Sequence, residues 1–150
     1  MNKAVLDSSA LLAFINQEKG YEIVEKYLPN AIMSSVNISE VVAVLSLIDI
    51  PQNIIIDIIN DLNIEIINFD QEQAIQTGFL RQTTKTLGLS LGDRACINLA
   101  SNQNLTIVTA DKIWKTLDLA SDLVLIIKIL DCMFKFNIKH TQNSVRKQVM

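Results

Sequence analysis

A chain of 150 residues with 49% hydrophobic side chains is long enough for one substantial core and too short for two ordinary domains. The net charge of −3 and the isoelectric point near 5.1 exclude an overall basic field, so nucleic-acid binding would depend on local patches. The two cysteines, Cys96 and Cys132, support neither a disulfide framework nor a zinc site, which favours a reducing, cytoplasmic location. Asp7 interrupts the apolar start and argues against a signal peptide. No later apolar run reaches the roughly 20 residues of a membrane span.

Short apolar runs alternate with helical patterns along the whole chain. Ser8 and Ser9 are placed to cap the first helix, and Pro29 closes the second. Asp70 is placed to cap the fifth. In chain order, the predicted strands cover residues 4–7, 31–36, 64–69, 105–109 and 123–127. The predicted helices cover residues 10–16, 21–28, 38–47, 51–62, 71–84 and 92–103.

This alternation predicts an α/β fold with three layers. Strands and helices of these lengths form a parallel sheet with right-handed crossovers and helices on both faces. We expect the domain to cover residues 1–130. Residues 131–150 are more polar and carry four basic residues against one acidic residue, so they are interpreted as a C-terminal extension.

Four acidic residues map to one edge of the predicted sheet. Asp7 ends the first strand, and Glu40 lies in the first turn after the second. Asp93 opens a helix, and Asp111 follows the strand over 105–109. Because ligands bind at the carboxyl ends of the strands in open parallel sheets, we expect these carboxylates to form one pocket.

Three of the four acids also have a purely structural explanation as helix caps. Asn37 and Glu40 have the spacing of a capping box, and so do Ser90 and Asp93. Asp111 could cap a short helix after the fourth strand. Taken singly, each of these residues is therefore explained by helix capping.

Asp7 is different, because Ser8 or Ser9 could cap its helix without it. A buried carboxylate without a partner is costly, and a group of carboxylates repels itself unless a proton or a cation intervenes. Oxygen-only ligands suit Mg²⁺ or Mn²⁺, which can activate water for the in-line hydrolysis of a phosphodiester. The acids together therefore predict a metal-dependent phosphodiesterase.

Other catalytic classes lack the necessary residues. The single histidine, His140, lies in the polar C-terminal segment, so a Ser-His-Asp or Cys-His mechanism has no suitable base. The glycines form neither a dinucleotide fingerprint nor a P-loop; they are Gly20, Gly78, Gly88 and Gly92.

Each of the four acids lies in a short motif. The segments are Val5-Leu-Asp-Ser-Ser-Ala-Leu-Leu-Ala13, Ser35-Val-Asn-Ile-Ser-Glu-Val41, Leu89-Ser-Leu-Gly-Asp-Arg-Ala-Cys96 and Val108-Thr-Ala-Asp-Lys-Ile-Trp114. In this order they resemble the four motifs of PIN domains in VapC-type toxins. The resemblance extends from residue 2 to about residue 130.

This resemblance implies a five-stranded parallel sheet in the order 3-2-1-4-5. It also implies an endoribonuclease that depends on Mg²⁺ or Mn²⁺, and a homodimer. A cognate VapB-type antitoxin would block the site. The chain would thus be the toxin of a toxin–antitoxin pair, with RNA as its substrate.

The resemblance further assigns roles to individual residues. The acidic, metal-binding positions of the family are occupied by Asp7, Glu40, Asp93 and Asp111, and its hydroxyl positions by Ser9 and Thr109. The hydroxyl groups would orient carboxylates or water. Arg94 is a candidate for contact with a substrate phosphate, although an ion pair on the helix surface is the commoner outcome. Trp114 has the spacing of a packing residue rather than of a platform for base stacking.

Two alternatives are considered. One is a PIN-like module that binds RNA or protein without cutting it. The other is a phospho-acceptor receiver domain, which needs adjacent acids after the first strand and an acceptor aspartate after the central one. Here Asp7 is followed by Ser8, and Asp57 lies within a helical isoleucine stripe, so the receiver reading is disfavoured.

Overall fold

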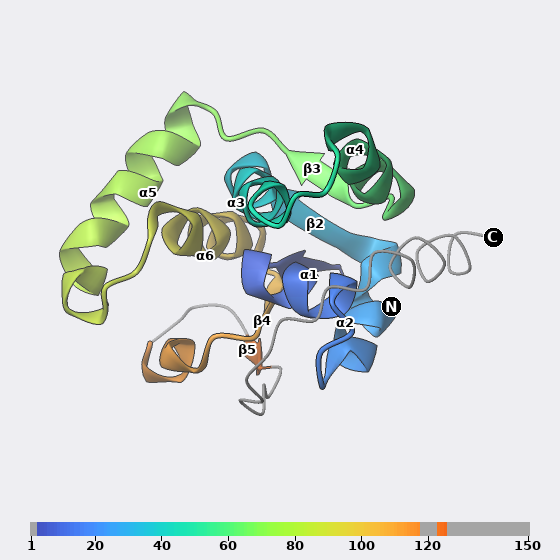
Figure 1. The fold of residues 1–150 in the computed structure, drawn as a ribbon. Coiled ribbons are helices and arrows are strands. Elements are labelled where there is room, and N and C mark those ends of the chain that lie inside the picture. The colour runs from blue at the N-terminus through green and yellow to red at the C-terminus, as the bar shows by residue number, and fades with distance from the viewer. Residues whose placement is uncertain (1–2, 118–122, 126–150) are drawn as a thin grey trace.

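The structure is a computed structural model that describes residues 3–117 and 123–125. Its centre is a sheet of five parallel strands in the order β3-β2-β1-β4-β5, as expected (Figure 1). The strands are β1 (Ala4–Leu6), β2 (Ala31–Ser34), β3 (Glu65–Ile67), β4 (Thr106–Thr109) and β5 (Leu123–Leu125).

Six α-helices and three short 3₁₀ helices connect the strands within the described part of the chain. The α-helices are α1 (Ser8–Ile15), α2 (Tyr21–Tyr27), α3 (Ser35–Ser46), α4 (Gln52–Asp61), α5 (Gln71–Thr84) and α6 (Leu91–Gln103). The 3₁₀ helices are η1 (Leu28–Asn30), η2 (Lys85–Leu87) and η3 (Lys112–Thr116). Every predicted helix is present, and its ends lie within three residues of the prediction; both ends of α5 coincide with it.

The largest differences fall at the starts of α1 and α3. The predicted caps Ser8 and Ser9 lie inside α1, because Asp7 is the cap and accepts a hydrogen bond from the Ser9 backbone N–H. Ser34 caps α3 in the same way, through the Val36 N–H. Asn37 therefore lies within the first turn of α3, and its predicted capping box with Glu40 is wrong.

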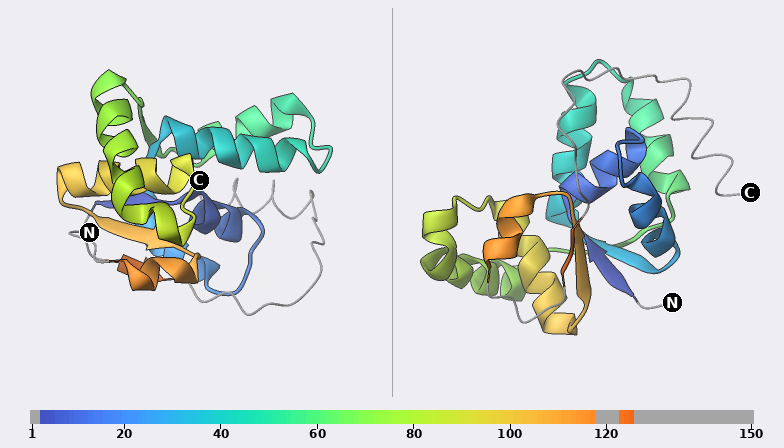
Figure 2. Two further views of the ribbon diagram at one scale, coloured as in Figure 1. Left: turned by 90° about the vertical axis from the view of Figure 1, so that its left-hand side faces the viewer. Right: turned by 90° about the horizontal axis from the view of Figure 1, so that it is seen from below.

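Alternating strand residues divide the core into two layers. In β1, Ala4 and Leu6 face the cluster formed with α1 to α4, whereas Val5 faces the cluster formed with α6 and η3. Figure 2 shows this three-layer arrangement in its right-hand view, with α1 to α4 on one side of the strands and α5, α6 and η3 on the other. The predicted three-layer α/β fold is confirmed.

The register of the sheet determines which residues meet at its carboxyl edge. Leu6 of β1 pairs with Val108 of β4, and the Asp7 N–H continues the ladder by donating to the Val108 carbonyl at 3.0 Å. The residue after β1 therefore lies beside Thr109, the last residue of β4. This neighbourhood brings together two motifs about 100 residues apart in the chain.

Two further expectations concern membrane spans and the C-terminal extension. Within the described residues, no helix is long and apolar enough to span a membrane. The predicted extension over 131–150, with Cys132 and His140, lies outside the described residues.

Candidate active site

Asp7 is the most buried of the predicted acids, with 3% of its surface exposed. The apolar strand before it and the helix it caps fix its backbone at the carboxyl end of β1. All its side-chain hydrogen bonds from described residues go to Oδ2. The Ser9 hydroxyl lies at 2.5 Å, the Thr109 hydroxyl at 3.0 Å and the Ser9 N–H at 3.3 Å. The second oxygen, Oδ1, therefore remains available to a ligand.

Backbone N–H groups orient the two hydroxyls toward Asp7. Ala110 N–H donates to Ser9 Oγ at 3.0 Å, and Asp111 N–H donates to Thr109 Oγ1 at 3.1 Å. Because each hydroxyl accepts from the backbone and has one proton, that proton is free to point at Asp7. Ser9 and Thr109 thus contact the Asp7 carboxylate, as the orienting role implied by the family resemblance requires.

Burial raises the pKa of Asp7 to about 6. The hydrogen bonds from Ser9 and Thr109 act in the opposite direction, and the negative charge of Asp93 raises the pKa further. The raised pKa shows that the site disfavours an isolated negative charge, which is the condition a bound cation would relieve.

Glu40 reaches the site from α3 and is partly buried. Its Oε2 accepts a hydrogen bond from Ser8 Oγ at 2.5 Å and a longer one from Asn37 Nδ2 at 3.4 Å. Ser8 directly follows Asp7, so the first turn of α1 links these two acids.

Asp93 belongs to the same group of charges while also capping α6. Its Oδ2 accepts from the Ser90 N–H at 2.7 Å, and Ser90 Oγ accepts from the Asp93 N–H at 3.1 Å. The predicted capping box is confirmed. Cys96, fully buried one turn further along α6, has a pKa raised by burial and then by Asp7, Asp93 and Glu40. Three of the four predicted acids therefore surround one region of the fold.

Asp111 lies at the edge of this group and is exposed. Its Oδ1 accepts from the Ile113 N–H at 3.0 Å, so the predicted cap of the short helix η3 is confirmed. Its link to the buried part of the site is its own backbone N–H, which donates to Thr109.

The oxygen donors suit a hard cation that keeps several of its bound waters, although the acids do not surround a site on all sides. Among residues 3–117 and 123–125, no three Asp, Glu, His or Cys side chains converge as a ready-made metal site. Mg²⁺ typically retains several waters and binds one or two carboxylates together with substrate phosphates. The free Oδ1 of Asp7 and the carboxylate of Glu40 fit that mode of binding.

Arg94 and Trp114 both make structural contacts. Arg94 donates to the backbone carbonyls of Ser90 at 3.3 Å and of Thr77 at 3.2 Å, which ties α6 to α5. The expected surface ion pair of Arg94 is not formed within the described part of the chain. Trp114 is fully buried in the cluster on the α6 side of the sheet, so its predicted packing role is confirmed.

Sequence reasoning missed three residues at this site: Ser8, Asn37 and Gly92. The sequence pattern predicts only capping roles for Ser8 and Asn37, and only the start of a helix at Gly92. The signal available was the spacing of Asn37 and Glu40, which lie on adjacent turns of one helix.

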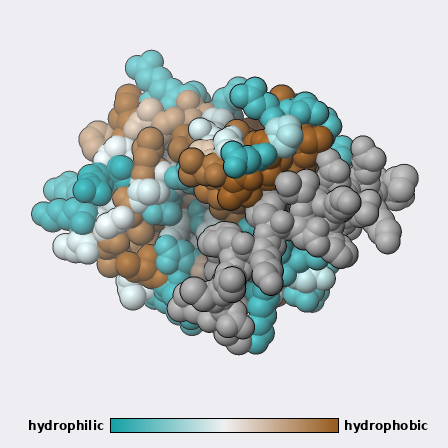
Figure 3. All heavy atoms as spheres, viewed as in Figure 1, coloured by the Kyte–Doolittle hydropathy of each residue, from teal (hydrophilic) through white to brown (hydrophobic). Residues whose placement is uncertain are grey.

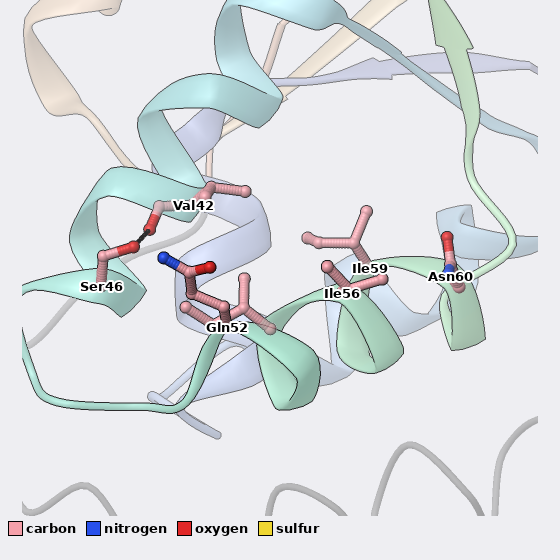
Figure 4. Close-up of a pocket in the computed structure, with 7 residues that line it drawn as sticks. Val42, Ser46, Gln52, Ile56, Ile59 and Asn60 are labelled. Carbon is pink, nitrogen blue, oxygen red and sulfur yellow. Dashed lines mark hydrogen bonds between the residues drawn. The ribbon is translucent and has the colours of Figure 1, made fainter.

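An apolar groove lies between α3 and α4. It encloses about 370 Å³, and side chains of α4 such as Ile56 and Ile59 face Val42 of α3 across it (Figure 4). Hydrophobic atoms gather over these two helices (Figure 3), and Ile56 is 58% exposed. None of the residues that line the groove is acidic, so the groove offers no carboxylate ligand to a divalent cation.

The comparison with protein families agrees with the fold. The PIN domain model matches residues 4–119, and the chain belongs to the PIN domain family. No curated protein matches it significantly.

Solved structures show the same fold. A toxin–antitoxin complex from Klebsiella pneumoniae is 21% identical with a TM-score of 0.66, covering 85% of this chain and 100% of that one. VapBC2 from Rickettsia felis, bound to a DNA fragment from its promoter, is 22% identical with a TM-score of 0.64, covering 81% and 97%. VapBC-5 from Mycobacterium tuberculosis is also 22% identical, with a TM-score of 0.54, covering 84% and 98%.

Proposed function

We propose that this PIN domain is a metal-dependent endoribonuclease and the toxin of a toxin–antitoxin pair. The observation that carries the proposal is Asp7. It is buried at the carboxyl end of β1, its Oδ2 is bound by two oriented hydroxyls, and its Oδ1 accepts no hydrogen bond from the described residues. Folding a carboxylate into this position has a cost that catalysis, rather than stability, explains.

The acids and the hydroxyl groups of the site have different proposed roles. Asp7 and Glu40 would hold Mg²⁺ or Mn²⁺, with Asp93 binding directly or through water and Asp111 at the outer edge. When bound, the ion supplies an activated water and stabilises charge on the attacking and leaving oxygens of the RNA phosphodiester. Ser9 and Thr109 keep Asp7 in one rotamer, and the capping box of Asp93 does the same for that carboxylate.

A partner is proposed from the structural neighbours. The similar structures include toxin–antitoxin complexes, and several of these are VapBC assemblies. We accordingly assign this chain a VapB-type antitoxin that covers the acidic site, a homodimeric state and a cytoplasmic place of action. Exposed Lys112 and Lys115, beside Asp111, supply local positive charge for an RNA backbone despite the acidic chain.

The test compares Asp7→Asn with wild type. After brief induction, RNA 5′ ends are mapped for both proteins, and the purified antitoxin-free proteins are assayed with Mg²⁺ and with Mn²⁺. We expect new 5′ ends and metal-dependent cleavage from wild type only. Asp57→Asn is the matched control, because Asp57 is an exposed acid on α4, and it should cleave like wild type.

Two results would contradict the proposal. Undiminished cleavage by Asp7→Asn would remove the assigned site. No cleavage of cellular RNA by antitoxin-free wild type with either metal would make the chain a PIN module that binds without cutting.

A further inference from the structure

Glu40 is held by residues from three helices. It lies on α3, its Oε2 accepts from Ser8 of α1, and its carboxylate lies against Gly92 of α6. Glu40 is only partly buried, so burial alone does not fix its rotamer. Its position depends on these side-chain contacts.

Asn37 of α3 connects its own helix with α1 and α6. It is fully buried, and its Nδ2 lies 3.0 Å from Ser8 Oγ and 3.1 Å from the Gly92 carbonyl. Ser8 has one proton, and the hydrogen bond from Asn37 occupies a lone pair of its oxygen. The Ser8 proton is therefore directed to an acceptor. The Glu40 carboxylate, at 2.5 Å from Ser8 Oγ, is nearer than the backbone carbonyl of Asn37, at 3.2 Å.

The other end of the Asn37 amide points to a role beyond stability. Its Oδ1 is buried and has no hydrogen-bond partner among the described residues. An unpaired buried oxygen destabilises the fold. The presence of Asn37 is thus explained by the contacts of its Nδ2 with Ser8 and Gly92, because its buried polar atoms are not all hydrogen-bonded.

Gly92 provides the space for the carboxylate. A Cβ built on Gly92 would overlap both carboxylate oxygens and Cδ of Glu40. The backbone of Gly92 does not need positive φ, so the requirement is for room and not for backbone freedom.

We infer that Ser8, Asn37 and Gly92 are positioning residues that hold Glu40 as a ligand for the divalent cation. The inference rests on the proposed function, because it assigns these residues to the same metal site. Adjacent serines then serve different acids: Ser8 orients Glu40, and Ser9 orients Asp7. In both cases an N–H group behind the hydroxyl directs its proton to the carboxylate.

The experiment measures Mn²⁺ affinity by calorimetric titration of the full-length, antitoxin-free chain. Ser8→Ala, Asn37→Ala and Gly92→Ala are each made in wild type and in a Glu40→Ala background. Loss of an outer partner typically weakens metal binding about 10- to 100-fold, and we expect that range for each variant in wild type. In the Glu40→Ala background we expect no further loss, because the group being positioned is gone.

Gly78→Ala is the matched control for Gly92→Ala. Gly78 lies on α5, and a Cβ there meets nothing within 4 Å. It should retain wild-type Mn²⁺ affinity. Thermal unfolding is followed for every variant, so that a loss of folding is separated from a loss of metal.

The outcomes separate this inference from the proposed function. If Asp7→Asn loses Mn²⁺ but the three variants bind like wild type, the inference is overturned and the proposed function stands. If the three substitutions weaken Mn²⁺ binding as much in the Glu40→Ala background as in wild type, their role is structural and the inference is also overturned. If wild type binds no Mn²⁺, both are overturned.

Discussion

The two halves of the acidic site hold their carboxylates by different means. The backbone places Asp7, because this residue continues the β1 ladder and caps α1, and Ser9 and Thr109 then orient its almost fully buried carboxylate. Glu40 extends from a helix, is partly exposed, and depends on contacts with Ser8, Asn37 and Gly92. The difference teaches that the backbone places the first acid in a buried position at an electrostatic cost, whereas side chains from neighbouring helices place the second.

The largest effect expected from this comparison is the pH dependence of stability that Asp7 imposes. Its folded pKa of about 6 lies above the ordinary 3.8, so the native state binds the proton more tightly than the unfolded state. The contribution of Asp7 to the stability of the metal-free protein should therefore be most favourable below pH 3.8 and should fall as the pH rises through 6. At about 1.36 kcal/mol per pKa unit, the loss is about 3 kcal/mol.

Asp7→Asn should remove that loss. In EDTA, unfolding midpoints measured from pH 4 to pH 7 should converge at the acid end, with the variant more stable at neutral pH. Equal pH profiles for the two proteins would show that Asp7 ionises without penalty, and the contrast with Glu40 would disappear.

The second prediction separates the adjacent serines. Ser9→Ala removes the largest of the hydrogen bonds that lower the Asp7 pKa, so that pKa should rise further. Ser8→Ala should leave the Asp7 pKa near its wild-type value, because Ser8 bonds to Glu40. A hydrogen bond to a charged group contributes about 1.5–3 kcal/mol, and NMR titration of the Asp7 carboxyl carbon measures the shift. Similar shifts in both variants would contradict the division.

The third prediction tests the charge of Asp93 on the buried half of the site. Asp93→Asn keeps an oxygen that can accept from the Ser90 N–H, so the capping box of α6 should survive. Removing the like charge should lower the Asp7 pKa, while the loss of a ligand should reduce cleavage by about 10-fold. An unchanged pKa in the NMR titration would show that the two acids are not coupled.

The smallest effect is expected at Asp111, which is exposed and belongs to neither buried half. Asp111→Ala removes the cap of η3 and should lower the free energy of unfolding by about 1 kcal/mol, measured by urea denaturation. Asp111→Asn preserves a capping oxygen and serves as the control. If the alanine variant loses as much Mn²⁺ affinity as Asp7→Asn, Asp111 is a principal ligand and the site has a third strong member.

Much of this architecture could be predicted from local patterns. The apolar runs predict all five strands, and Asp70 caps α5 as expected. The errors concern helix starts. Ser34 and Asp7 end apolar runs that resemble longer strands, so the sequence pattern does not identify them as the caps of α3 and α1. Capping depends on the hydrogen bond that a side chain makes, and a spacing rule permits several.

The sequence by itself determined the alternation of strands and helices, and that each of the four acids follows a strand or opens a helix. Only the tertiary structure decided which hydroxyl serves which acid. Successive helical residues are rotated by about 100°, so Ser8 and Ser9 point to different neighbours although they are adjacent in the chain. Those neighbours, Glu40 and Thr109, come from distant segments that the sheet register and helix packing bring together, and the same packing leaves room for Glu40 only because residue 92 is glycine.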